Sequence, residues 1–159
     1  MISFDLTGKV AVVTGASSGL GEQFAKALSE QGCDVAVLAR RVERLEELSK
    51  KLKENGHDCL PVACDVTNEE SIKEAVKKIE EYYGHIDILV NNAGLALGTD
   101  KEHEGNLDEY FLMIDTNIKG LLTCTRSIVP GMVERQSGHI INIGSIAGDG
   151  AYPGGSVYC

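Results

Sequence analysis

The sequence predicts an α/β fold, a doubly wound parallel sheet with helices on both faces. Two observations support this fold class. Short runs rich in Val, Ile, Leu and Ala alternate with longer amphipathic segments, and each run is nearly continuously apolar. In addition, a glycine-rich loop joins the first run to the first amphipathic segment. Neither a linker nor a change in composition divides the chain, so we expect one domain over residues 1–159.

Five segments have the composition of strands that are buried on both faces. They span residues 9–14, 34–39, 58–63, 87–90 and 139–144. Four helical segments lie between them, at residues 19–31, 42–55, 67–83 and 107–133. The first three of these helices are followed by glycines, which commonly end a helix with positive φ: Gly32, Gly56 and Gly84.

Two of the helices carry further local signals. Thr67 and Glu70 have the spacing of a capping box, which predicts that the threonine hydroxyl caps the third helix. The fourth helix is long, and we expect it to bend near residues 117–120 and again near Pro130, because proline cannot donate the helical hydrogen bond.

The charge and the metal-binding residue types restrict the partners of the chain. Of 159 residues, 15 are Lys or Arg and 24 are Asp or Glu, which leaves a formal net charge of −9. Nucleic acids and anionic membranes repel such a chain, and we expect neither as a partner. The five cysteines are scattered, which indicates reduced thiols in a cytoplasmic protein. The four histidines show no metal-ligand spacing, so we expect no metal.

The glycine-rich loop spans residues 14–21 and has the sequence TGASSGLG. It follows a predicted strand and opens a predicted helix, where backbone amides and the helix dipole bind a pyrophosphate. A tight turn without a ligand is the alternative for such a loop, but its place in a βαβ unit that closes at Ala39 favours a dinucleotide site. The candidate contacts are Gly15, Ser17, Ser18, Gly19, Leu20 and Gly21.

The residues after the second strand bear on the choice of cofactor. An NAD site places an acidic residue there, but this strand ends at Ala39 and is followed by Arg40 and Arg41. Two guanidinium groups suit a ribose 2′-phosphate, with Arg40 as the expected main contact and Arg41 as its helper. This predicts NADP(H) as the preferred cofactor and NAD(H) as the alternative. A solvated helix start also explains this arginine pair, although cations are unfavourable in a first helical turn.

Several motifs together resemble the short-chain dehydrogenase/reductase family. The loop has the spacing TGxxxGxG, and the sequence NNAG at residues 91–94 follows the fourth predicted strand. Asn117, Ser145 and Tyr158 match the family's helix asparagine, catalytic serine and catalytic tyrosine. The resemblance covers the whole chain and implies a Rossmann-type fold. The further cofactor contacts that it implies are Asp65, Val66, Asn92, Ala93 and Gly94. A turn residue is an equal explanation of Asp65.

The resemblance implies a role for each catalytic candidate. Tyr158 exchanges a proton with the substrate oxygen while a hydride moves to or from the nicotinamide, and Ser145 hydrogen-bonds the same oxygen. Asn117 anchors a water molecule in the proton relay. Taken singly, Ser145 is equally explained as a loop hydrogen-bonder, and Asn117 as a helix kink or a buried amide.

The tyrosine needs a cationic neighbour. A free phenol, with a pKa near 10, is a poor base unless a cation favours its phenolate. The family supplies a lysine four residues after the tyrosine, and this position lies beyond Cys159. We therefore expect an N-terminal fragment with about five of the usual seven strands, incomplete at its C-terminus, inactive alone, and with an uncovered edge at the fifth strand. The resemblance further implies that the whole protein is a homodimer or homotetramer.

The substrate is indicated less sharply than the cofactor. Residues 145–158 and 92–98 resemble the subgroup of this family that acts on 3-hydroxy acids such as serine and allo-threonine. The N-terminal half equally resembles sugar-acid, 3-oxoacyl and hydroxysteroid dehydrogenases. For the complete protein we expect an NADP-dependent oxidoreductase acting on a small secondary alcohol or ketone. The alternative is a non-catalytic dinucleotide-binding module, which has no need of Ser145 and Tyr158.

Overall fold

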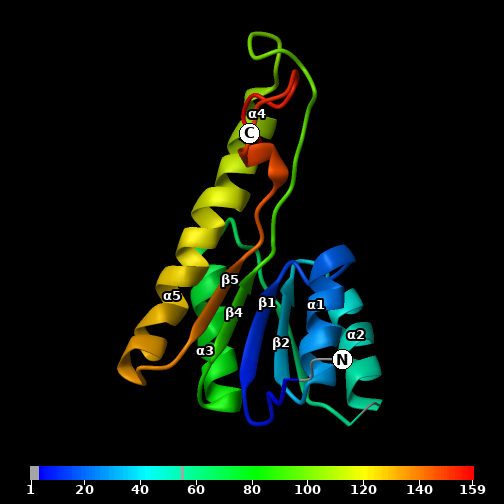
Figure 1. Cartoon of the computed structure of the whole chain (residues 1–159), viewed down its shortest axis with the longest axis vertical. Helices are drawn as coiled ribbons and strands as arrows, with labels where there is room; N and C mark the ends of the chain where they lie inside the picture. Colours follow the sequence, from blue (N-terminus) through cyan, green and yellow to red (C-terminus); the bar gives the residue numbers. More distant parts are fainter. Residues whose placement is uncertain (1–3, 55) are drawn as a thin grey trace.

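A five-stranded sheet forms the centre of the computed structural model, which describes residues 4–54 and 56–159 (Figure 1). The strands are β1 (Val10–Thr14), β2 (Asp34–Ala39), β3 (Cys59–Ala63), β4 (Ile88–Asn91) and β5 (His139–Asn142). Their order in the sheet is β3-β2-β1-β4-β5, and all neighbours pair in parallel. The strand order reverses between β1 and β4, which opens a crevice at the carboxyl ends of these strands. The predicted Rossmann-type fold and all five predicted strands are confirmed.

Helices cover both faces of the sheet. Their bounds are α1 (Gly19–Glu30), α2 (Val42–Glu54), α3 (Glu69–Tyr83), α4 (Leu107–Ile114) and α5 (Leu121–Glu134). Alternate residues of β1 enter different cores, since Val13 belongs to the cluster that contains Leu45 of α2, while Val12 belongs to the cluster that contains Ile72 of α3 and Ile128 of α5. This alternation explains why the strands are continuously apolar. Residue 55, the predicted end of the second helix, lies outside the described residues.

The predicted capping box of α3 is wrong. The N-cap is Asn68, whose side chain accepts a hydrogen bond from the Ser71 amide at 3.0 Å. The Thr67 hydroxyl donates instead to the Asp65 carboxylate at 2.8 Å, and Glu70 contacts Lys73. Asparagine is as good an N-cap as threonine, and the nearby Asp65 carboxylate engages the threonine hydroxyl.

The predicted fourth helix is a continuous rod whose middle is irregular. Residues 115–120 form a π-helical segment, η1 (Asp115–Gly120), between α4 and α5. A Cβ atom at Gly120 would lie 2.8 Å from the Val66 carbonyl oxygen, so glycine allows η1 to approach the segment after β3 closely. The helix continues past Pro130 to Glu134. Short π-helical segments often occur at functional sites, and this one lies above the carboxyl end of the sheet (Figure 1).

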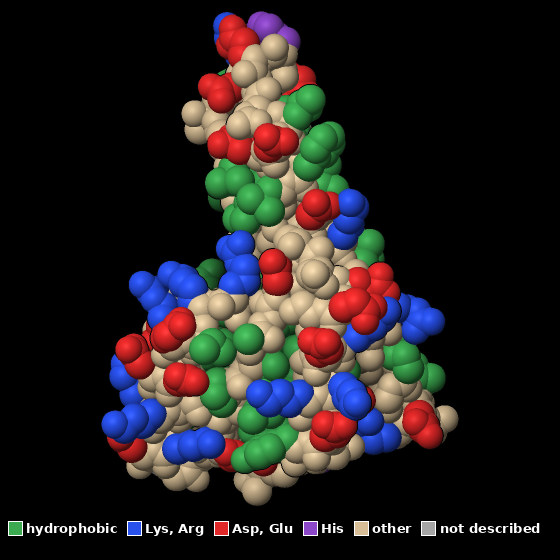
Figure 2. Space-filling view, turned by 180° about the vertical axis from the view of Figure 1, so that it is seen from behind, with side chains coloured by type: hydrophobic (Ala, Val, Ile, Leu, Met, Phe, Trp, Pro, Cys, Tyr) green, Lys and Arg blue, Asp and Glu red, His purple; other side chains and the backbone are tan. Residues whose placement is uncertain are grey.

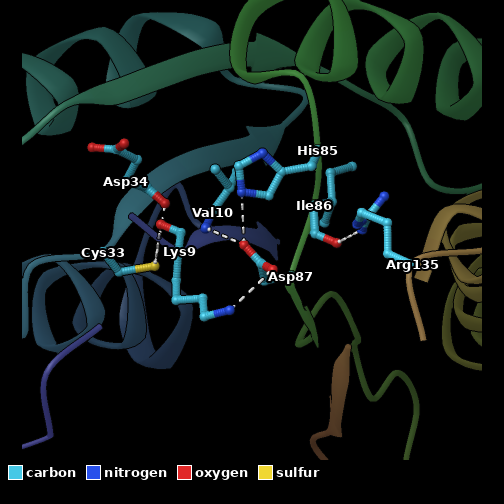
Figure 3. Close-up of polar contacts among 8 residues, drawn as sticks. All are labelled: Lys9, Val10, Cys33, Asp34, His85, Ile86, Asp87 and Arg135. Atoms are coloured by element: carbon cyan, nitrogen blue, oxygen red, sulfur yellow. Dashed lines mark hydrogen bonds and ion pairs between the residues drawn. The ribbon is translucent and has the colours of Figure 1, made fainter. Parts of the chain in front are cut away.

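Polar side chains connect β1 and β4 at the amino ends of the strands (Figure 3). The Asp87 carboxylate, whose side chain is only 10% exposed, accepts a hydrogen bond from the Val10 amide at 3.0 Å. It also lies 3.0 Å from His85 Nε2 and 3.4 Å from Lys9 Nζ. The Asp87 backbone bonds to both neighbouring strands, through its amide to β1 and through its carbonyl to β5. One residue, directly before β4, therefore joins β1, β4 and β5 at their amino ends.

Two surfaces outside the core are apolar. All four residues of β5 are exposed, which confirms the predicted uncovered edge. On the rod, four large apolar side chains at helical spacing are each more than half exposed: Leu107, Phe111, Ile118 and Leu122. Figure 2 shows apolar side chains along the narrow upper arm to which the rod belongs. No helix in the described part of the chain is both long enough and apolar enough to cross a membrane.

Candidate active site

A cleft lies along the carboxyl ends of the strands. These strand ends are at the upper end of the sheet in Figure 1. It has two adjoining halves. The half above β2 and β3 has a volume of about 310 Å³, and the half above β4 and β5 has a volume of about 660 Å³. Both halves are lined by the glycine-rich loop at residues 14–21, called the phosphate loop below, and by the segment after β4. The shared lining residues are Gly15, Ser18, Ala93, Gly94 and Leu95. We call these the nucleotide half and the reaction half.

Each glycine of the phosphate loop serves a different structural purpose. Gly15 has a φ of +67°, and a Cβ atom there would lie 2.9 Å from the Cα of Ala93. At Gly21, a Cβ atom would lie 2.5 Å from the Gly15 carbonyl oxygen. Gly19 begins α1 with a φ of +61° and faces open space. Gly19 and Gly21 therefore shape the loop without lining the cleft, while Gly15 lines both halves.

Thr14 connects this loop to the NNAG segment. Its hydroxyl oxygen accepts hydrogen bonds from the amides of Asn92 at 3.1 Å and Ala93 at 3.0 Å. The Asn92 side chain returns a hydrogen bond to the Thr14 carbonyl at 2.9 Å. Thr14 thus fixes the segment after β4 to the phosphate loop, at the place between β1 and β4 where the strand order reverses. This role of Thr14 was not predicted from the sequence.

Asn91, the last residue of β4, performs a similar task toward β5. Its side-chain amide donates to Thr125 Oγ1 at 3.0 Å and to Asn142 Oδ1 at 2.9 Å. The residue is 4% exposed, and its own Oδ1 has no partner among the described protein atoms. This contact ties the carboxyl end of β5 to α5, three residues before Ser145.

The nucleotide half contains a prearranged cation. The Arg41 guanidinium donates to Ser17 Oγ at 3.0 Å and to Ser18 Oγ at 3.2 Å. Arg40 also lines this half, but it makes no polar contact in the part of the chain that the structure describes. A guanidinium and two hydroxyls converge where the sequence predicts a 2′-phosphate, an arrangement that suits an anion.

Asp65 and Val66 line the same half. The Asp65 carboxylate accepts from both the amide and the hydroxyl of Thr67, at 3.0 Å and 2.8 Å. Asp65 is therefore a turn residue, and it also borders the cleft. The two explanations that the sequence leaves open are compatible.

The reaction half brings the three catalytic candidates together. Ser145 accepts a hydrogen bond from the Ala147 amide at 3.2 Å and caps a short 3-10 helix, η2 (Ile146–Gly148). Tyr158 lies in the C-terminal segment and lines the same half. No lysine, arginine or histidine within the described ranges lines this half.

Both polar atoms of the Asn117 side chain make hydrogen bonds. Its Oδ1 accepts from the Leu95 amide at 2.9 Å, and its Nδ2 donates to the Leu95 carbonyl at 2.7 Å. This paired contact holds the segment after β4 against η1, although Asn117 is only partly buried and also lines the reaction half. A role for Asn117 in a proton relay stays a prediction.

The buried thiols are unsuited to nucleophilic chemistry at neutral pH. Burial raises the pKa of Cys64, which lines the nucleotide half, to about 11. Burial likewise raises the pKa of Cys124 to about 12. Both remain protonated near pH 7, and a protonated thiol is a poor nucleophile. Among the described residues, no cluster of three or more His, Cys, Asp and Glu side chains could hold a metal ion.

Most of the lining residues that were not predicted lie at, or just after, the carboxyl end of a strand: Leu38, Ala39, Cys64, Thr67, Asn91, Leu95, Ala96, Asn142, Ile143 and Gly144. The others, Thr116, Leu121 and Gly148, lie in η1, α5 and η2. Position relative to a predicted strand end is the signal that could have identified the majority, because such residues converge on one edge of a parallel sheet.

Comparison with known proteins agrees with this geometry. The sequence profile of the family described as short chain dehydrogenase matches residues 9–159. The chain belongs to the short-chain dehydrogenase family. It is 47% identical over 149 residues to the NADP-dependent 3-hydroxy acid dehydrogenase YdfG of Salmonella typhi. That alignment covers 94% of this chain and 59% of the relative, so the chain spans about three fifths of the length of this short-chain dehydrogenase.

Solved short-chain dehydrogenase structures share the fold. Serine dehydrogenase from Escherichia coli has a TM-score of 0.87 at 46% identity, with 94% of this chain and 68% of that chain covered. The closed form of serine dehydrogenase complexed with NADP⁺ has a TM-score of 0.88, also at 46% identity, with 94% of this chain and 59% of that chain covered.

Proposed function

We propose that the whole protein is an NADP-dependent oxidoreductase that interconverts a small alcohol and the corresponding carbonyl compound. The observation that carries this proposal is the single cleft that unites the Arg41–Ser17–Ser18 cluster with Ser145 and Tyr158. Support also comes from the relatives, which are named NADP-dependent 3-hydroxy acid dehydrogenases, and from the NADP⁺ complex of serine dehydrogenase.

The residues of the nucleotide half fit such a cofactor. Arg41 and the two serine hydroxyls bind the 2′-phosphate, and the unpaired amides at the start of α1 bind the pyrophosphate. A side chain at Gly15 would clash with the Ala93 backbone, so glycine lets the phosphate loop pack directly against the segment after β4 beside the cleft. When bound, the nicotinamide supplies or accepts the hydride.

The residues of the reaction half handle the oxygen and its proton. Ser145 donates a hydrogen bond to the substrate oxygen and so holds it toward Tyr158. Tyr158 gives a proton to that oxygen during carbonyl reduction and takes it back during alcohol oxidation. Asn117 keeps the segment after β4 in place as one wall of this half through its paired contact with Leu95.

We propose a 3-hydroxy acid such as serine as the substrate, on the strength of the relatives' names. The described lining residues of the reaction half offer no cationic side chain to a carboxylate. A clamp for the acid group must therefore come from residues outside this lining. Turnover of serine and of an uncharged primary alcohol of similar size, compared in the whole protein, tests the assignment, because a 3-hydroxy acid site prefers serine.

The cofactor experiment uses the two arginines as a matched pair. NADP and NAD are titrated against wild type, Arg41→Ala and Arg40→Ala at one moderate salt concentration, because phosphate contacts are screened. A charge-assisted hydrogen bond contributes about 1.5–3 kcal/mol, so Arg41→Ala should weaken NADP about ten- to a hundredfold. NAD binding should hold, and Arg40→Ala should have the smaller effect. Equal proportional loss of both cofactors would contradict the 2′-phosphate assignment.

The charge reversal Arg40→Asp separates a phosphate contact from a structural role. It should weaken NADP through repulsion and leave NAD unchanged or improved, because a carboxylate accepts from the ribose hydroxyl. If Arg40→Asp leaves both cofactors unaffected while Arg41→Ala does not, the phosphate is read by Arg41 alone.

A non-catalytic dinucleotide-binding role is favoured for the isolated 159-residue chain by one observation, the absence of a cation among the described residues around Tyr158. We propose that this chain binds NADP but turns over no alcohol. The assay is NADPH formation with secondary alcohols by the purified chain. Turnover that disappears on Tyr158→Phe would refute the proposal.

We also propose that the whole protein is a homo-oligomer. The exposed stripe formed by Leu107, Phe111, Ile118 and Leu122 is the supporting observation, because contiguous apolar side chains on a helix favour association. Sedimentation of wild type against Phe111→Glu is the test, and the variant should dissociate.

A further inference from the structure

The C-terminal segment that carries Tyr158 touches the segment after β4 at a glycine. The two segments lie side by side at the upper end of the molecule (Figure 1). Gly154 has a φ of +85°, and a Cβ atom there would lie 2.5 Å from the carbonyl oxygen of Thr99. The carbonyl carbon and Cα of Thr99 would be 3.0 and 3.1 Å away. All three neighbours are backbone atoms, so rotation of a side chain cannot relieve the contact.

Thr99 is poorly placed to retreat. Two residues before it, the Leu97 amide donates to the sulfur of Met113 at 3.3 Å. Asn117 holds Leu95 through two hydrogen bonds. The segment after β4 is therefore attached to the rod at two positions close to Thr99, and a clash at Gly154 will displace the C-terminal segment more readily than this one.

A displacement at Gly154 reaches Tyr158 through a compact pair of turns. The Gly155 amide donates to the Tyr152 carbonyl at 3.0 Å, and the Gly155 carbonyl accepts from the Cys159 amide at 2.9 Å. Gly155 is buried, and Tyr158 lies within the second turn. Ser145, in contrast, is positioned by β5 and by its own cap on η2. Tyr158 and Ser145 thus depend on separate supports.

We infer that Gly154 is a positioning residue: its bare backbone seats the Tyr158 segment on the Thr99 backbone and thereby sets the distance from the Tyr158 hydroxyl to Ser145. This inference rests on the proposed oxidoreductase function for its kinetic consequence. A misplacement of about 1 Å at a catalytic group costs on the order of a hundredfold in rate. The nucleotide half takes no part in the contact, so cofactor binding should not depend on Gly154.

The kinetic experiment compares Gly154→Ala with Gly150→Ala in the whole protein. Gly150 belongs to the same segment, its backbone is outside the left-handed region, and a Cβ atom there meets no atom within 4 Å. We expect Gly154→Ala to lower kcat about ten- to a hundredfold with the NADP Kd within about twofold of wild type. Gly150→Ala should match wild type in both quantities.

A second variant separates the contact from backbone strain. Asparagine tolerates the left-handed conformation better than alanine, but it carries the same Cβ atom. Gly154→Asn should therefore lose as much kcat as Gly154→Ala while its thermal unfolding stays closer to wild type. Wild-type kcat in both Gly154 variants, or an equal loss in Gly150→Ala, would overturn the inference.

Hydrogen exchange tests the contact without any activity assay. In the 159-residue chain, Gly154→Ala should speed amide exchange in residues 150–159, where the Gly155 and Cys159 amides are hydrogen-bonded, while Gly150→Ala leaves this segment unchanged. Unchanged exchange in residues 150–159 of Gly154→Ala would refute a role of the contact in holding this segment. If the exchange result holds but wild type oxidises no alcohol, the proposed function fails and the contact stands.

Discussion

The two ends of the same parallel sheet use their polar groups in opposite ways. At the amino ends, the Asp87 carboxylate is almost fully buried and accepts from the Val10 amide with His85 beside it (Figure 3). At the carboxyl ends, the Arg41 guanidinium is exposed and is supported only by hydroxyls, and Tyr158 faces an open cleft. Polar groups at the amino ends satisfy each other's hydrogen bonds, while those at the carboxyl ends leave hydrogen-bond donors for a ligand.

The topology explains this difference. In a doubly wound sheet, helix amino termini and the loops that follow the strands gather at the carboxyl edge, which therefore presents unpaired amides and positive potential. The amino edge receives helix carboxyl ends instead, and here Arg135 at the end of α5 donates to the Ile86 carbonyl at 2.6 Å. Functional residues are therefore expected at the carboxyl edge and stabilising residues at the amino edge.

The largest effect expected from this comparison is on catalysis at the carboxyl edge. Tyr158→Phe in the whole protein removes the group that exchanges the proton and should lower kcat by about 10²–10⁴-fold. The NADP Kd and the unfolding midpoint should stay near wild type, because the phenol oxygen makes no described hydrogen bond within the fold. Steady-state kinetics and cofactor titration measure both, and a proportional loss of NADP affinity would show that Tyr158 is a binding residue instead.

The next largest effect is on stability at the amino edge. Asp87→Ala leaves the buried Val10 amide without an acceptor and should cost about 2–3 kcal/mol in free energy of unfolding. Asp87→Asn keeps an acceptor for that amide and loses only charge contacts with partly exposed His85 and Lys9, so it should cost about 1 kcal/mol or less. Denaturant unfolding gives these values. NADP affinity equal to wild type in both variants would support a purely stabilising role of the amino edge, and a selective loss of NADP binding would contradict it.

The smallest expected effect lies beside Arg41. Ser17→Ala removes one of the two hydroxyls that hold the guanidinium, a contact of about 0.5–1.5 kcal/mol, and should weaken NADP about two- to tenfold. NAD affinity and the unfolding midpoint should not change. A drop in unfolding midpoint as large as that of Asp87→Ala would mean that the carboxyl edge stabilises the fold as strongly as the amino edge does.

Local pattern by itself determined the elements and their class. Continuous apolar runs and helical spacing located the five strands and the helices α1, α2 and α3 to within a few residues, and predicted α4, η1 and α5 as one long helix. The glycine spacing located the phosphate loop. These signals depend on neighbours in the chain. The capping of α3 was predicted wrongly although all residues concerned are close in the chain: Thr67 and Asn68 are both good caps, and the Asp65 carboxylate engages the Thr67 hydroxyl, which leaves Asn68 as the cap.

Only the tertiary structure decided which side chains meet. Sequence could not rank Arg41 above Arg40, since the serines that hold Arg41 lie more than twenty residues earlier. Nor could it pair Asn117 with Leu95 or seat Gly154 on Thr99, contacts that form when the rod and the C-terminal segment fold over the carboxyl edge. Such contacts depend on the packing of whole elements, and a residue's chain neighbours carry no information about them.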